Sequence, residues 1–117
     1  MTTTQIDKLE DAYAAFNARN IPAVLLHMHP DVMWANGWEG GHVQGHEAVK
    51  EYWTRQWGEL DPLVEPVGFS GREDGRIVVT VHQVVKNKEG QLLSDGTVHH
   101  IYTFEGDAIK RMDIEKA

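Results

Sequence analysis

Near its start, the chain places apolar side chains three or four positions apart, which is the spacing of one helical face. The members of this stripe are Ile6, Leu9, Tyr13 and Phe16. Thr4 supplies a start signal, and the polar residues 17–20 interrupt the pattern. The pattern therefore predicts an amphipathic helix from about Thr4 to Phe16, with its apolar side against a core.

A second, shorter helix is predicted to follow. Asn20 and Pro22 are typical of a helix cap and a first helical turn. The apolar residues after them continue the helical pattern as far as Met28. Pro30 disfavours helix in the residue before it, so we expect this helix to stop near His29.

The next segments predict a strand and a third helix. Residues 32–36 read as a short strand, and the glycine-rich stretch after them reads as a turn or hairpin. Helical spacing returns from His46, and we expect Gly58 and Pro62 to end this helix. Its apolar face is predicted to contain Val49, Tyr52, Trp53, Gln56 and Trp57.

The second half of the chain reads as strands separated by glycine-containing turns. The predicted strands are 63–70, 76–86, 91–104 and 108–115. Helices followed by a meander of antiparallel strands predict an α+β fold, with the helices packed on one face of the sheet.

Turn lengths set which side chains share a face of this sheet. A two-residue loop at 106–107 would place His100 opposite Asp113 and Tyr102 opposite Arg111. A two-residue loop at 89–90 would place His100 opposite Val79. A bulge in either hairpin would instead swap His99 for His100.

Two faces follow from this register. The face assigned to the helices contains Val79, Val81, Gln83, Val98, His100, Tyr102, Phe104, Ile109, Arg111 and Asp113. The opposite face contains Val78, Thr80, His82, His99, Ile101, Thr103, Lys110, Met112 and Ile114. Enclosed polar groups must find partners or line a wet cavity, and the mixed outer face suits a homodimer contact.

Composition narrows the class of protein. The 117 residues fit one domain spanning 1–117, and 41% hydrophobic residues are enough for one core. Eleven basic and eighteen acidic residues give a net charge of −7, which argues against nucleic acid as a partner. Without cysteine, a signal segment or a long apolar run, we expect a cytoplasmic protein with no membrane contact.

The sharpest candidate for chemistry is His100 with Asp113. A carboxylate beside an enclosed imidazole can hold one tautomer for acid/base work, and Arg111 would stabilise developing negative charge. The alternative is a structural hydrogen bond in which Arg111 neutralises Asp113. The seven histidines do not converge in the predicted elements, so we expect no metal and no cofactor.

Other residues suggest a ligand site. Trp34, Asn36 and Trp38 alternate along the predicted strand and would form an aromatic wall with one orienting amide. Gln83 and Tyr102 lie on the enclosed face of the sheet. Four aromatic residues on helical stripes are either ligand contacts or core, namely Tyr13, Phe16, Trp53 and Trp57.

Several segments together resemble a known family. They are Tyr13-Ala-Ala-Phe16-Asn17, Ile21-Pro-Ala-Val24-Leu25, Met28-His-Pro30-Asp31-Val32-Met-Trp34, Gly45-His-Glu-Ala48-Val49-Lys-Glu-Tyr52-Trp53 and the stretch from Tyr102 to Ile114. The chain resembles SnoaL-like proteins of the nuclear transport factor 2-like superfamily, which includes ketosteroid isomerases, polyketide cyclases and limonene epoxide hydrolases. This resemblance implies a cone-shaped fold, in which a curved antiparallel sheet wraps three helices around a ligand pocket, and a homodimer through the outer sheet face.

The resemblance also bears on the reaction. The base of ketosteroid isomerases falls on Asn36, and their oxyanion Tyr and Asp fall on Ala12 and His100, so this reaction is not expected. SnoaL-like cyclases place an acid/base Asp on the last strand near a His, as Asp113 and His100 would be. Epoxide hydrolases need an Arg between two Asp, and only Arg111 with Asp113 is present.

Three functions stay open. The first is a cofactor-independent isomerase, cyclase or lyase acting on a small apolar oxygen-bearing molecule. Asp113 and His100 would then be acid and base, and Asn36 would orient the substrate. The others are a non-catalytic ligand-binding module and a dimerisation domain whose cavity is filled by Trp34, Trp53 and Trp57.

Overall fold

Three helices and six strands form an α+β fold, as the sequence predicts. The computed structural model describes every residue from Met1 to Ala117. The helices are α1 (Thr3–Asn17), α2 (Ile21–Leu25) and α3 (His46–Glu59). The strands are β1 (Met28–Ala35), β2 (His42–Gln44), β3 (Leu60–Gly71), β4 (Ile77–Asn87), β5 (Leu92–Glu105) and β6 (Ala108–Lys116). No helix combines the length and the apolar character needed to cross a membrane.

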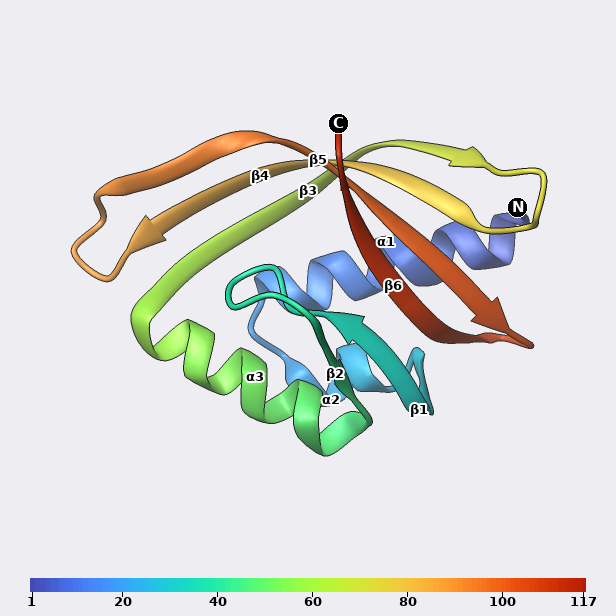
Figure 1. Cartoon of the computed structure of the whole chain (residues 1–117), viewed down its shortest axis with the longest axis horizontal. Coiled ribbons are helices and arrows are strands. Elements are labelled where there is room, and N and C mark those ends of the chain that lie inside the picture. The colour runs from blue at the N-terminus through green and yellow to red at the C-terminus, as the bar shows by residue number, and fades with distance from the viewer.

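The six strands form one curved sheet in the order β2-β1-β6-β5-β4-β3. β1 runs parallel to β6, and every other neighbouring pair is antiparallel. The sheet expected from the sequence to be antiparallel is therefore mixed at β1, which enters it after a helix rather than after a hairpin turn. Figure 1 shows the sheet bending over the helices, with the long arm of β3, β4 and β5 extending above α3.

The first two helices begin at capping residues. Thr2 closes a capping box at the start of α1, and the Asn20 side chain accepts a backbone N–H in α2. α2 ends at Leu25, so the prediction that it includes Met28 is wrong. Met28 begins β1 and pairs with Ile109 of β6, and this pairing with the sheet overrides the local helical pattern.

Helix α3 runs directly into strand β3. The helix ends at Glu59, and Leu60 already belongs to the strand, which was predicted to begin at Leu63. Pro62 therefore lies inside a strand. The missing N–H of Pro62 is tolerated because β3 is at the edge of the sheet.

The register of β4 against β5 matches the prediction. Val79 pairs with His100 and Thr80 with His99, so His100 points to the helices and His99 points away from them. The hairpin arm of these two strands carries this register as far as the pair of Val85 with Ser94.

The register of β5 against β6 differs from the prediction by one residue. Phe104 pairs with Ile109 as expected, but Thr103 pairs with Arg111, which leaves Lys110 in a β-bulge. His100 is consequently opposite Ile114, and the predicted pairing of His100 with Asp113 is wrong. The bulge brings Met112 into the core and leaves the two charged side chains at 111 and 113 on the outer face.

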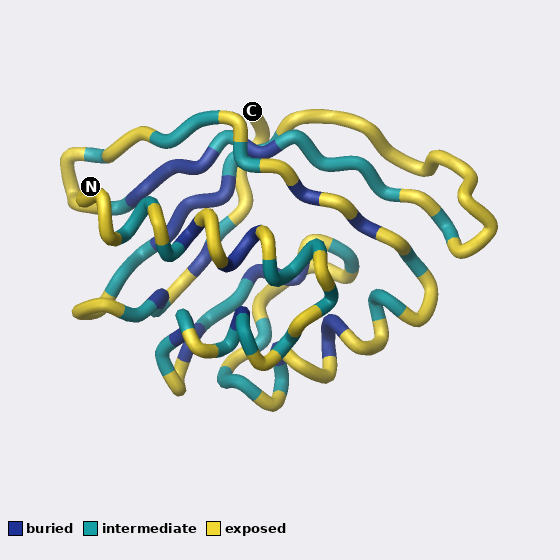
Figure 2. The backbone as a smooth tube through the Cα atoms, turned by 180° about the vertical axis from the view of Figure 1, so that it is seen from behind, coloured by how far each residue is buried: buried dark blue, intermediate teal, exposed yellow.

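The core lies between the helices and the concave face of the sheet. Fully buried side chains come from every layer and include Leu9, Val32, Val49, Trp53, Val79 and Ile109. In Figure 2 the buried segments gather where the middle of the sheet faces the helices, and the hairpin ends are exposed. Val78 and Ile101 are also buried, although their register places them on the outer face.

The bulge yields a prediction about stability. Inserting one alanine after Lys110, with the bulge kept, would turn the following residues over, sending Arg111 and Asp113 inward and Met112 outward. We expect a loss of about 3 kcal/mol or more in the free energy of unfolding, because buried charges and a lost core side chain are both costly. Urea unfolding measures this loss. Insertion of one alanine after Lys88 in the exposed β4–β5 connection is the control, and equal losses in the two insertions would contradict the assigned register of β6.

Candidate functional site

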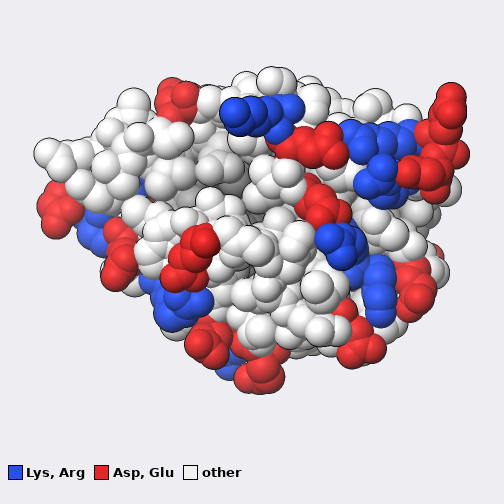
Figure 3. All heavy atoms as spheres, viewed as in Figure 1, with Lys and Arg blue, Asp and Glu red and all other residues white.

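A cavity of about 490 Å³ lies between the concave face of the sheet, helices α1 and α3, and the loop that joins β1 to β2. Seventeen of the 23 residues in its wall are hydrophobic, and none is Asp, Glu, Lys or Arg. Figure 3 shows a hollow in the upper part of the molecule that is bordered mainly by uncharged atoms. This volume and polarity are typical of a site for a small, mainly apolar molecule.

Aromatic side chains named from the sequence form much of the wall. Trp34 comes from β1, Phe16 from α1 and Trp53 from α3. The rings of Trp34 and Phe16 meet that of Trp53 edge-on, with centroid separations of 5.6 and 5.4 Å. Trp38 adds a fourth ring from the β1–β2 loop. Because the rings pack on one another, the wall is formed before any ligand arrives.

Trp57 does not reach the cavity. It stacks on Trp53 with a centroid separation of 5.8 Å, and the Arg19 guanidinium lies 5.0 Å from its ring centroid. Its indole N–H is buried without a hydrogen-bond partner. Trp57 therefore supports Trp53 and is not part of the wall.

A chain of hydrogen bonds lies at the buried end of the cavity. The Tyr102 hydroxyl donates to the Tyr13 oxygen at 2.8 Å, and the Tyr13 oxygen lies 2.8 Å from His100 Nδ1. Burial raises the pKa of both tyrosines and lowers the pKa of His100 from 6.5 to about 4. All three side chains are therefore uncharged at neutral pH.

This arrangement fixes the tautomer of His100. The Tyr13 oxygen already accepts the Tyr102 proton, so the Tyr13 hydroxyl is left to donate to His100 Nδ1. The remaining proton of the neutral imidazole must then be on Nε2. Nε2 has no hydrogen-bond partner in the protein. It is not enclosed by protein atoms either, so it is exposed to the cavity that His100 lines. The cavity is thus supplied with one oriented N–H donor.

The two charged residues expected beside His100 lie elsewhere. Arg111 and Asp113 pair on the outer face, with Arg111 Nε donating to Asp113 Oδ2 at 2.9 Å. His42 Nε2 lies 2.9 Å from the same carboxylate. Partial burial opposes ionisation of Asp113, but the bonds from Arg111 and His42 outweigh it and hold its pKa below the usual range. Neither Arg111 nor Asp113 lines the cavity.

Asn36 shapes the wall without belonging to it. Strand β1 ends at Ala35, so the expected alternation through Asn36 stops there. The Asn36 side-chain oxygen accepts the backbone N–H groups of Trp38 and Glu39 at 3.0 and 2.7 Å. Glu39 in turn accepts from Arg55 of α3 at 2.9 Å. These contacts hold the loop against α3 and bring Trp38 to the cavity.

Of the residues named from the sequence, the structure gathers eight at the cavity. They are Tyr13, Phe16, Trp34, Trp38, Trp53, Gln83, His100 and Tyr102. Sequence reasoning did not assign a further set of wall residues to the site, namely Tyr52, Gln56, Ser94, Met112 and Ile114. The signal for Gln56 was its polar side chain within an apolar helical face. No signal marked Met112 and Ile114, because the bulge that turns them inward leaves no trace in the alternation.

The side chains of the cavity do not form a set of metal ligands. His100 is the only imidazole in the wall, and no carboxylate lies near it. Elsewhere in the chain, no three His, Asp or Glu side chains are close enough together to hold a metal ion.

Solved structures with the same arrangement support the geometry. TerC, co-crystallised with polyporic acid, is 26% identical, with a TM-score of 0.84 over 98% of this chain and 92% of its own. A nuclear transport factor 2-like protein of unknown function from Burkholderia pseudomallei is 22% identical, with a TM-score of 0.85 over 99% of this chain and 92% of its own. A putative polyketide cyclase from Sinorhizobium meliloti is 21% identical, with a TM-score of 0.74 over 93% and 94%. A search of curated proteins found no significant match.

The family comparison covers most of the chain. The model of the SnoaL-like domain matches residues 9–112, from α1 to the bulged part of β6. This span includes every residue of the cavity wall except Ile114. The chain therefore belongs to the SnoaL-like domain family, and it has the nuclear transport factor 2-like fold.

Proposed function

We propose that this chain binds a small, mainly apolar molecule through a carbonyl or enol oxygen, which accepts a hydrogen bond from His100 Nε2. The observation that carries the proposal is the oriented imidazole N–H donor of His100 at the buried end of an apolar cavity. A ligand without an oxygen there would leave this donor unpaired once water is displaced, which is unfavourable. The donor thus selects for an acceptor at one end of the ligand.

The wall favours a flat ligand. The rings of Trp34, Trp38 and Trp53 provide broad apolar surface, and aromatic faces pack well against ring systems. No charged side chain lines the cavity, so a charged ligand would lose its hydration without compensation. A neutral aromatic or polycyclic ketone, enol or quinone meets both conditions.

The same donor gives the cavity a chemical capability. A neutral imidazole N–H stabilises negative charge that develops on a carbonyl oxygen, as in the formation of an enolate. Tyr13 and Tyr102 reinforce this polarisation, because each hydroxyl in the chain donates toward His100. Enolisation and ring closure through an enolate are the reaction types that would benefit. The acid/base role expected for Asp113 is not part of this proposal, because that carboxylate is paired on the outer face.

Two of the similar structures support a small-molecule site. TerC was crystallised with polyporic acid, and the Sinorhizobium meliloti protein is described as a putative polyketide cyclase. Both share the curved sheet and the enclosed helices with this chain.

A second candidate is binding without turnover. The cavity wall has no carboxylate, and the low pKa of His100 makes it a weak base at neutral pH. These two observations favour a carrier or sensor over an enzyme that must abstract a proton. Both candidates use the same donor and the same wall.

Binding of 2-acetylnaphthalene, a flat ketone, tests the proposed donor. His100→Phe should weaken binding about tenfold, because a net hydrogen bond of roughly 1.4 kcal/mol is lost. Quenching of tryptophan fluorescence measures the affinity, and the carbonyl stretch of the bound ketone should shift to higher frequency in the variant. His100→Gln, which keeps an N–H donor, should retain part of both effects. Equal affinity and an unchanged carbonyl stretch in His100→Phe would refute the role of His100.

The neutrality of His100 predicts a pH dependence of stability. Its pKa is about 4 when folded and 6.5 when exposed, so the unfolded chain binds the extra proton between these values. Stability is therefore greatest above pH 6.5 and declines as the pH falls toward 4. Relative to His100→Gln, which does not titrate, the wild type should lose about 3 kcal/mol between pH 7 and pH 4. Urea unfolding across this range measures the difference, and a constant difference would show that His100 is not held neutral.

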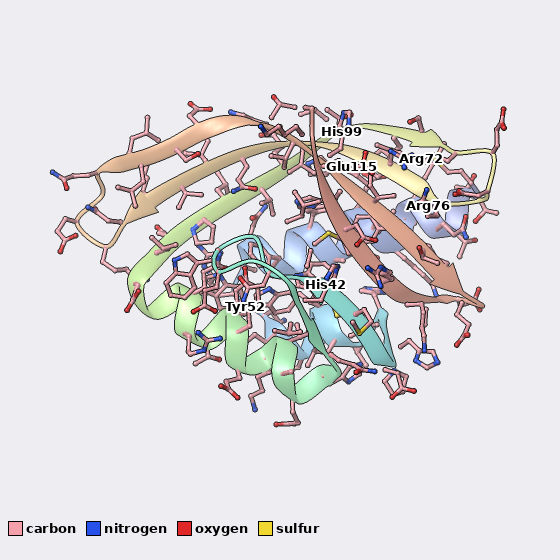
Figure 4. The ribbon with its side chains drawn as sticks, in the orientation of Figure 1. His42, Tyr52, Arg72, Arg76, His99 and Glu115 are labelled. Atoms are coloured by element: carbon pink, nitrogen blue, oxygen red, sulfur yellow. The ribbon has the colours of Figure 1, made fainter.

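We also propose a homodimer through the outer face of the sheet. Thr80, His82 and Val84 are half-buried along the outer side of β4, and exposed Leu63 of β3 pairs with Val84. Figure 4 shows an ionic group on the same side, in which Arg72 donates to Glu115 at 2.8 Å. An accessible face that mixes apolar, polar and paired ionic side chains is compatible with a contact between subunits.

Sedimentation of a charged variant tests this contact. Thr80→Arg would place two guanidinium groups near each other across a two-fold interface, so the dimer should dissociate into monomers. Thr54→Arg, on the exposed side of α3, is the matched control and should stay dimeric. A dimeric Thr80→Arg variant would exclude this face, and a monomeric wild type would exclude the dimer.

A further inference from the structure

Three polar side chains in the cavity wall have no partner in the protein. They belong to Gln56 on α3, Gln83 on β4 and Ser94 on β5, and none of them donates or accepts a side-chain hydrogen bond. Gln83 and Ser94 lie where the cavity opens, because Gln83 pairs with Gly96 and residues 92–97 of β5 are exposed, whereas His100 is buried. The cavity therefore has a second polar region, at its mouth.

The strand register sets the separation between the two polar regions. Val79 of β4 pairs with His100, and Gln83 lies four residues further along the same strand, opposite Gly96. Four residues of extended strand span about 13 Å. Because the sheet is concave and both side chains point inward, we expect on the order of 10 Å between their hydrogen-bonding atoms.

Gly96 leaves the mouth end open. It alternates on β5 with Ser94 and Val98, which both line the cavity, so a side chain at this position would point inward. A Cβ built on Gly96 meets no atom within 4 Å, and the backbone there is not in the left-handed region. Neither crowding nor backbone conformation requires glycine, and glycine weakens a strand. Its effect is to leave the amide of the opposite residue, Gln83, uncovered.

We propose that the cavity takes an elongated ligand with a second neutral oxygen function, which the Gln83 amide binds at the mouth, and that Gly96 is a specificity-determining position that admits this end. This inference rests on the proposed function, in which His100 binds the first oxygen. Beyond the proposed function, this inference specifies the length of the ligand and a polar group at each of its two ends. Ser94 lies on the neighbouring strand, two residues from the partner of Gln83 and on the same face, and can share the same oxygen.

The chemistry of the mouth specifies the second group. An amide both donates and accepts, so it binds a hydroxyl, a carbonyl or another amide equally well. A carboxylate would meet no cationic side chain in the wall and is disfavoured. The substrate class is therefore a flat, neutral molecule with one oxygen at each end of an apolar body.

Two related probes separate the ends of the cavity. 2-Acetylnaphthalene has an oxygen at one end, and 6-acetyl-2-naphthol has a hydroxyl at the other end as well. The wild type should bind 6-acetyl-2-naphthol three- to tenfold more tightly, since a hydrogen bond to a neutral group contributes about that much. Tryptophan fluorescence quenching gives both dissociation constants.

Two independent variants test the assignment. Gln83→Met, which keeps the length of the side chain without its amide, should bring the ratio of the two dissociation constants to about one. Gly96→Leu, which covers the amide, should also abolish the preference. The matched controls are Gln44→Met on β2 and Thr97→Leu on the outer side of β5, and both should keep the wild-type ratio.

The outcomes distinguish this inference from the proposed function. If 2-acetylnaphthalene binds in a His100-dependent way but the wild-type ratio is one, the second polar region is wrong and the proposed function stands. If the preference persists in both Gln83→Met and Gly96→Leu, the assignment to Gln83 and Gly96 is overturned. If 2-acetylnaphthalene does not bind the wild type, the proposed function fails and this inference fails with it.

Discussion

The offset of one residue between β5 and β6 decides which side chains reach the cavity. Without the bulge at Lys110, the last strand would present Arg111 and Asp113 to the interior. With it, Met112 and Ile114 face inward and both charges stay on the outer face, in contact with solvent. An apolar cavity wall without charge follows directly from this offset. So does the neutrality of His100, because no carboxylate is near enough to favour its protonated form.

The buried hydrogen-bond chain joins two layers of the fold. Tyr13 belongs to α1, and Tyr102 and His100 belong to β5, so the two bonds tie the first helix to the centre of the sheet. In a low dielectric such bonds are strong when every member is paired. One atom, His100 Nε2, is left unpaired within the protein. The cavity completes the network only when a ligand or water occupies it.

Much of this could be predicted from the sequence, because helical spacing and strand alternation reflect burial directly. These two patterns predicted all three helices, the four long strands and the orientation of His100, and the structure confirms them. The pairing of His100 with Asp113 failed because a bulge changes register without changing composition. The predictions for the end of α2 and for the position of the Asn36 side chain were wrong for another reason. Both depend on contacts with distant or folded-back backbone, namely Ile109 for Met28 and the turn N–H groups for Asn36.

The direct passage from α3 into β3 has a consequence for how such a cavity changes over time. With no connecting residue between Glu59 and Leu60, α3 and the sheet edge form one mechanical unit. A shift of the helix along its axis therefore also displaces the first residues of the strand that borders the same cavity. We therefore expect the cavity to adapt to a larger or smaller ligand by substitution of side chains such as Trp53, while the distance between α3 and the sheet stays the same.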